Sequence, residues 1–192
     1  KPKTIWFFAS LLSFIMAITY LCYDLSPLKY YLTKDPNFPL TNFQFNVLYS
    51  IIGMVNCLFC FVNATLIDVY GDTIGLMLGT TLISIGQLSL SVGYSNTEFA
   101  PMVIGRVLVG IGFDLVIEGA NSLCNCWFKS FEVSFAHGWF TCCCLSGMMT
   151  GQILLPYLYN TYPKHFFWII LALSLVSILC AISIFALDLR LV

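Results

Sequence analysis

The chain has 192 residues, of which 59% are hydrophobic and 9% are charged, and its mean hydropathy is +0.90. This composition excludes an ordinary soluble domain and indicates a polytopic membrane protein. The net charge of -1, with eight scattered Lys and Arg residues, argues against a nucleic-acid partner.

Six apolar segments are long enough to cross a hydrocarbon layer of about 30 Å at about 1.5 Å per residue. We therefore expect an all-α membrane protein whose single domain is a six-helix transmembrane bundle covering residues 1–192. The predicted spans are residues 5–23, 45–66, 74–94, 101–127, 133–159 and 166–187.

The connections between these spans differ in length. Residues 25–42 carry three prolines and predict a loop outside the membrane. The turns at residues 68–73 and 94–98 are short, and the charged residues 129–132 predict a break before the fifth span. Pro156 is expected to kink or end that span.

An even number of spans places both ends of the chain on one side of the membrane. The Lys and Arg residues outside the spans favour cytosolic termini by four to three. Those on the side of the termini are Lys1, Lys3, Lys129 and Arg190, and those on the other side are Lys29, Lys34 and Lys164.

The nine cysteines fall in or at the ends of hydrophobic spans, so we interpret them as small apolar packing residues. Cys124 and Cys126 have no second pair that would complete a zinc site. We expect neither a metal nor a cofactor. Asn63 begins a formal glycosylation sequence, but its place in the second span predicts that it is not used.

The fourth span carries the polar residues that point to function. At about 100° per residue they lie within about 120° of one another on one helix face. Charges at membrane depth are costly and face a bundle interior or a wet cavity, so this face predicts a substrate or ion pathway. The alternative is a buried salt bridge that only holds helices together. The residues of this face are Arg106, Gly110, Asp114, Glu118, Asn121 and Asn125.

Asp114 and Glu118 are four residues apart, so their carboxyl groups are neighbours that do not both ionise easily. The pair could carry a proton, or either carboxylate could bond to backbone groups or to another part of the protein and never titrate. Arg106 lies about 12 Å along the axis from Asp114 and about 18 Å from Glu118. Its partner must therefore lie elsewhere. His137 is a weaker candidate, equally compatible with an interfacial role.

Glycines at four positions predict close helix packing. Gly147 and Gly151 form a G-x-x-x-G pattern in the fifth span, and Gly110 and Gly112 lie in the fourth.

Two motifs resemble the major facilitator superfamily. The turn at residues 64–73 resembles its G-x-L-x-D-R-x-G-R-R loop, with Leu66, Asp68 and Gly71 in register. The fourth span resembles its R-x-x-x-G-x-G pattern, at Arg106, Gly110 and Gly112. The resemblance implies that Asp68 and Gly71 belong to a conformational turn. It also implies a cavity where the first two spans meet the fourth, lined by Tyr23, Asp24, Asn46, Tyr49 and Asn56.

The strings LIDVYG, IGQ, GRVLVGIG and WFK resemble the lysosomal dipeptide transporter branch of that superfamily. Two departures stand out. The basic positions of the turn are Val69, Asp72 and Thr73, and an arginine expected in the fifth span falls at Leu145.

The resemblance implies the N-terminal half of a secondary transporter of a small polar organic solute, working by alternating access against a second six-helix half that is not in this chain. A peptide-like substrate and proton coupling are open options. The alternatives are a transport-inactive subunit or adaptor and, less favoured, an intramembrane enzyme using Asp114, Glu118 and His137; we expect no enzyme. The expected partners are the lipid bilayer, the solute, and a second half or partner subunit. A lysosomal, another intracellular or the plasma membrane fits.

Overall fold

The computed structural model describes residues 2–36, 38–163 and 165–188. Within these ranges there are six helices long and apolar enough to cross a membrane, and no β-strand. The predicted all-α class with six transmembrane helices is therefore confirmed. Lys1, Lys164 and Arg190, which entered the charge count, lie outside the described residues. The elements are α1 (Pro2–Tyr23), η1 (Ser26–Leu28), α2 (Lys29–Thr33), α3 (Asn42–Tyr70), α4 (Asp72–Ser95), α5 (Phe99–Trp127), α6 (Ser130–Thr161) and α7 (Phe166–Asp188).

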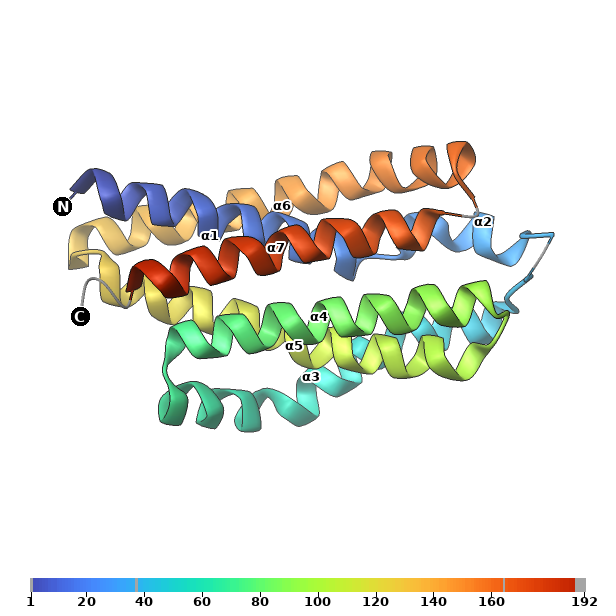
Figure 1. The fold of residues 1–192 in the computed structure, drawn as a ribbon, viewed down its shortest axis with the longest axis horizontal. Coiled ribbons are helices and arrows are strands. Elements are labelled where there is room, and N and C mark those ends of the chain that lie inside the picture. The colour runs from blue at the N-terminus through green and yellow to red at the C-terminus, as the bar shows by residue number, and fades with distance from the viewer. Residues whose placement is uncertain (1, 37, 164, 189–192) are drawn as a thin grey trace.

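The long helices lie roughly along the long axis of the bundle and alternate in direction, and the start of α1 and the end of α7 lie at the same end of the bundle, here called the end of the termini (Figure 1). The short helix α2 and the turn between α4 and α5 lie at the opposite end. Helix α4 packs against α5 and α7, and α1 packs against α6 and α7. Helix α5 also contacts α3 and α1. One face of α5 is thus directed at α1 and α3, where the candidate site lies.

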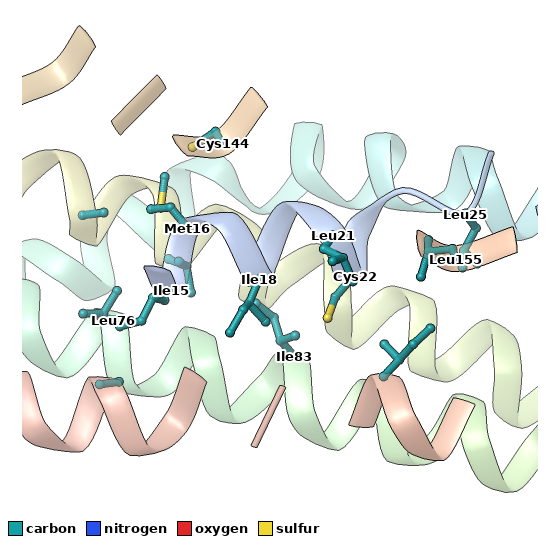
Figure 2. Close-up of a cluster of buried hydrophobic side chains, with 14 of the residues drawn as sticks. Ile15, Met16, Ile18, Leu21, Cys22, Leu25, Leu76, Ile83, Cys144 and Leu155 are labelled. Carbon is teal, nitrogen blue, oxygen red and sulfur yellow. The ribbon is translucent and has the colours of Figure 1, made fainter. Parts of the chain in front are cut away.

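Buried side chains of α1 form the centre of the hydrophobic core. Figure 2 shows Ile15, Ile18 and Cys22 of α1 beside Leu76 and Ile83 of α4. Met16 and Leu21 belong to the same cluster, which Cys144 and Leu155 of α6 complete. The core cluster thus joins side chains of α1, α4 and α6, while α1 itself packs against α6 and α7 and reaches α5 at its last turn.

Glycines set the distance between α4 and α5. A Cβ added to Gly112 would lie 2.6 Å from the carbonyl oxygen of Gly79, and one added to Gly86 would lie 2.6 Å from the carbonyl oxygen of Gly105. Each pair is reciprocal, because a Cβ on Gly79 or Gly105 meets the opposing backbone just as closely. The two backbones are therefore in direct contact at two levels, an approach that larger residues would prevent.

The outward faces of α3 and α6 remain uncovered in this chain. Helix α3 packs chiefly against α5, and α6 chiefly against α1. Large apolar side chains are exposed on both, including Met54, Leu58 and Phe61 on α3 and Met149 and Ile153 on α6. In a membrane protein such faces contact lipid or further protein.

The connections correct several expectations. The turn predicted at residues 68–73 is a single residue, Gly71, because α3 continues to Tyr70 and α4 begins at Asp72. The φ of Gly71 is +92°, a backbone conformation that favours glycine. Residues 25–42 are not an open loop, because they form η1 and α2 and bury Leu28, Leu32 and Leu40. The predicted break at residues 129–132 is also shorter, since α6 begins at Ser130. Pro156 does not end α6, which continues to Thr161.

Candidate functional site

Arg106 occupies the centre of the junction between α1, α3 and α5. It is 1% exposed, its Nε donates to the carbonyl oxygen of Leu48 at 3.0 Å, and its Nη2 donates to that of Tyr23 at 2.8 Å. Tyr23 is the last residue of α1, so its carbonyl lacks an intrahelical donor and the guanidinium caps that helix. The sequence predicts a partner away from the other charges of α5, and the structure supplies two main-chain oxygens.

The third guanidinium nitrogen of Arg106, Nη1, is buried and has no hydrogen-bond partner among the described residues, unlike Nε and Nη2. The same holds for one carboxylate oxygen of Asp114 and one of Glu118, both on half-buried side chains of α5. Burying an ionised group without a partner is costly, so each carboxylate needs a proton or a cationic partner at this depth.

Helix α3 presents two asparagines to this face of α5. Asn63 is fully buried and donates from Nδ2 to the carbonyl oxygen of Ile111 at 3.3 Å. Asn56 lies against Gly110, where an added Cβ would be 3.2 Å from its Oδ1. The side-chain oxygens of both asparagines are buried and unbonded in the described structure.

Unpartnered buried polar atoms therefore gather on the three helices that meet here. Every one found within the described residues belongs to α1, α3 or α5. The six atoms are Thr19 Oγ1, Asn56 Oδ1, Asn63 Oδ1, Arg106 Nη1, Asp114 Oδ2 and Glu118 Oε2. Asn63 and Thr19 were not predicted as site residues. Asn63 is seven residues after Asn56 and so shares its helix face, a signal that could have found it.

Aromatic rings of α1 pack beside the acidic pair. Tyr23 stacks on Phe113 with centroids 4.2 Å apart, and Tyr20 meets the same ring edge-on at 5.0 Å. Phe113 precedes Asp114, so the ring contacts hold this part of α5 against α1. Tyr23 thus contributes both its carbonyl oxygen and its ring to the junction.

The remaining predicted lining residues take different positions. Asp24 is 7% exposed and accepts hydrogen bonds from the backbone nitrogen of Ser26 at 2.9 Å and from Gln152 at 2.5 Å. Asn46 and Asn121 are exposed, and Tyr49 is 48% exposed. These three side chains are therefore not part of the buried junction.

The predicted turn and the histidine lie nearer the end of the bundle that carries the termini. Asp68 is exposed, and the neighbouring Asp72 accepts a hydrogen bond from the Cys126 thiol at 3.6 Å. His137 is within hydrogen-bond distance of the Asn125 side chain at 3.0 Å, which links α6 to α5. None of the nine cysteines, all of which lie within the described residues, forms a disulfide bond.

The four predicted packing glycines are not equivalent. Gly112 abuts the α4 backbone, as described above, and an added Cβ on Gly147 would clash with the backbone of Ala17 in α1. Gly110 meets side-chain and backbone atoms of α3 at 3.2 Å or more. At Gly151 the nearest atom would be 3.8 Å away, which is ordinary contact.

The described residues form six helices long and apolar enough to span a membrane, with polar side chains buried between them, which is the architecture of a polytopic membrane protein. The chain matches the Major Facilitator Superfamily over residues 4–190 and belongs to that family. Its members are transporters that bind small-molecule substrates within the membrane.

The chain is similar to the lysosomal dipeptide transporter MFSD1 from three animals. It is 26% identical to the Mus musculus protein over 79% of this chain, 26% to that of Bos taurus over 78%, and 29% to that of Danio rerio over 62%. The matched regions cover 32%, 32% and 26% of those proteins, so the chain spans about a third of their length.

A solved structure shares the fold. The chain superimposes on a crystal structure of the peptide transporter POT in complex with alafosfalin with a TM-score of 0.73. The sequences are 16% identical, and the match covers 94% of this chain and 37% of the other.

Proposed function

We propose that this chain forms the N-terminal six-helix half of a secondary transporter that moves a small polar solute by alternating access. One observation carries the proposal: within the described residues, the buried polar atoms that lack partners all lie on α1, α3 and α5, around the face that carries Arg106, Asp114 and Glu118. A bundle built only for stability would bond such groups internally. Groups that remain unbonded suit a solute, a proton or a second half.

The two carboxylates of α5 suggest which part of the solute this half would bind. Asp114 and Glu118 are acceptors, and the nearest buried cation on their helix, Arg106, is already bonded to main-chain oxygens. A solute carrying an ammonium group would supply the missing donors. A proton on one carboxyl would do the same, which is why we include proton coupling in the proposal.

The names of the relatives make dipeptides the first probe. Leu145 of α6 is 52% exposed and uncharged at the position where the resemblance implies an arginine. This half therefore offers no charge there for a peptide carboxylate. A small monoamine without a carboxylate is for that reason the second probe.

The second half would cover the exposed faces of α3 and α6, and the termini would face the cytosol. A lysosomal or other intracellular membrane is proposed from the named relatives, with the plasma membrane as the alternative. We propose that the protein acts as a transporter and not as an enzyme, because its family consists of transporters.

The test uses the full-length protein in proteoliposomes. Uptake and counterflow are measured with a labelled dipeptide and with a labelled monoamine, for the wild type, Asp114→Asn and Glu118→Gln. We expect saturable uptake of one probe by the wild type and at least about a tenfold loss in one acid variant, the usual effect of losing a charged partner. Folded protein that neither binds nor transports either probe would favour the adaptor alternative.

A further inference from the structure

The described residues of the connection between α1 and α3, 24–36 and 38–41, are here called the strap. It lies at the end of the bundle opposite the termini, together with the C-terminal ends of α4 and α6 (Figure 1). Leu40 donates its backbone N–H to the carbonyl oxygen of Leu32 at 3.0 Å and closes the loop that carries Asp35. The strap is therefore a folded element with its own buried side chains.

Side chains tie the strap to the last turns of α6 at three points. The first is the bond from Gln152 to Asp24, and the second joins Asn160 to the Tyr31 hydroxyl at 3.3 Å. At the third point the Tyr159 hydroxyl donates to Asp35. The end of α6 and the strap are thus bonded to each other over several turns.

Asp35 bonds the strap to two different helices. It is 4% exposed, and its Oδ2 accepts hydrogen bonds from Tyr159 of α6 and from Tyr94 of α4. The two hydroxyl oxygens lie 3.2 Å apart. We call these three residues the clasp, because one carboxylate oxygen joins the strap to two helices.

Aromatic rings enclose the clasp. Tyr159 contacts Tyr31 and Phe166 with ring centroids 5.6 and 5.4 Å apart, and Tyr94 contacts Phe167 at 4.7 Å. Such an enclosure excludes water and strengthens the hydrogen bonds to the carboxylate. It also makes the loss of any one bond more costly.

Pro156 makes the segment beyond it a weakly attached end of α6. A proline inside a helix has no N–H, so the carbonyl of Gln152 loses its intrahelical donor, and the ring crowds the preceding turn. Helices bend most often at such positions. The residues that follow, 157–161, contain Tyr159, so the clasp holds the part of α6 that the helix itself holds least.

We propose that the clasp is a latch between a hinged helix end and the strap: residues 157–161 of α6 pivot at Pro156, and both these residues and the strap are released when the bonds to Asp35 break. This inference rests on the proposed transport function. The strap and residues 157–161 are the part of this half that opens and closes at the end of the bundle away from the termini. The clasp stabilises the closed arrangement.

Hydrogen exchange measured by mass spectrometry on the full-length protein in lipid nanodiscs tests the latch. The variants are Tyr159→Phe and Tyr94→Phe, which each remove a single hydroxyl, and the control is Tyr157→Phe, whose ring is exposed. Loss of a bond to a carboxylate should speed exchange about tenfold or more in peptides from residues 24–41 and 153–163 together. The control should match the wild type.

The proposal is overturned if both clasp variants exchange like the wild type, or if the strap exchanges faster while residues 153–163 do not change. Faster hydrogen exchange in both peptides of folded Asp35→Asn protein would support the proposal, and wild-type exchange in both would contradict it. This measurement needs no transport, so its result is independent of whether the proposed function holds. Where uptake of the labelled dipeptide is measurable, Tyr159→Phe should change the maximal rate at least twofold at an unchanged half-saturating concentration. An unchanged maximal rate would overturn the gating role.

Discussion

Replacing Gly112 by alanine tests one of the close backbone contacts between α4 and α5. The added Cβ would lie 2.6 Å from the carbonyl oxygen of Gly79, whereas ordinary contact begins near 3.4 Å. The backbones of α4 and α5 must therefore separate by about 0.8 Å, a gap that forfeits a quarter to a half of the local dispersion energy. We expect the substitution to cost about 2 kcal/mol, within the range for overpacked cores.

Gly53→Ala is the matched control, because an added Cβ at Gly53 meets nothing within 4 Å. Both variants gain the same helix propensity of about 1 kcal/mol, so that term cancels in the comparison. Thermal unfolding in detergent, followed by tryptophan fluorescence, should place Gly112→Ala about 4–8 °C below Gly53→Ala. Equal melting temperatures for the two variants would refute the proposed backbone contact.

Three further predictions use other contacts. Arg106→Lys should lower the free energy of unfolding by about 1.5–3 kcal/mol, because the compact ammonium cannot reach the carbonyl oxygens of both Leu48 and Tyr23 as the wider guanidinium does; denaturant titration measures this, and an unchanged midpoint would argue against a stabilising role for these two bonds. Asn63→Ala should lower the free energy of unfolding by about 1 kcal/mol in the same titration, because it removes the bond to the Ile111 carbonyl. Wild-type protein from eukaryotic cells should show no glycan at Asn63, since this side chain of α3 is buried. In detergent, the exposed Cys57 thiol should react with a maleimide at least about tenfold faster than the buried Cys22 thiol, with labelling located by mass spectrometry.

The contact between α4 and α5 could have been predicted from the sequence. Glycines recur every seven residues in both helices, and this spacing keeps them on one face of each. In α4 and α5 they are Gly79, Gly86, Gly93, Gly105, Gly112 and Gly119. Two such faces in consecutive spans joined by a short turn predict an antiparallel pair, because adjacent elements pack together. Of these six, Gly112 is among the predicted packing glycines, and its partner on α4 was not predicted.

The hydrogen-bond partners of Arg106 could not be predicted from the sequence. Arithmetic along the helix shows that Asp114 and Glu118 are too distant, and this holds in the structure. The oxygens that the guanidinium bonds belong to the main chain of Tyr23 and Leu48, and every residue has such an oxygen. No pattern of residue types can therefore identify them, since the choice depends on where α1 ends and how α3 crosses α5.

The packing of the strap could not be predicted from the sequence, for a different reason. Three prolines correctly indicated that no long helix crosses residues 25–42, but the same composition hid the packing. Leu28, Leu32 and Leu40 are buried, but two prolines separate Leu32 from Leu40, so the three do not form a recognisable face of one helix. Asp35 was passed over because an aspartate in a polar connection is normally solvated. Its burial depends on Tyr159, 124 residues further along the chain.

The acidic pair of α5 allows function and stability to be separated. Asp114 and Glu118 each keep a buried carboxylate oxygen without a partner in the described structure, so neutral isosteres remove a desolvation cost and break no bond that the structure shows. Asp114→Asn and Glu118→Gln should therefore leave the melting temperature unchanged or raise it, while uptake falls, as expected for residues retained for function at a cost in stability.

Asp24→Asn is the opposing control, because the Asp24 carboxylate accepts bonds from Ser26 and Gln152 that an amide satisfies less well. That variant should melt at a lower temperature by an amount equivalent to about 1–3 kcal/mol. If Asp114→Asn and Glu118→Gln instead melt as low as Asp24→Asn and leave uptake intact, the two carboxylates are structural. The face of α5 would then be a packing surface, and the substrate pathway would have to lie elsewhere in the protein.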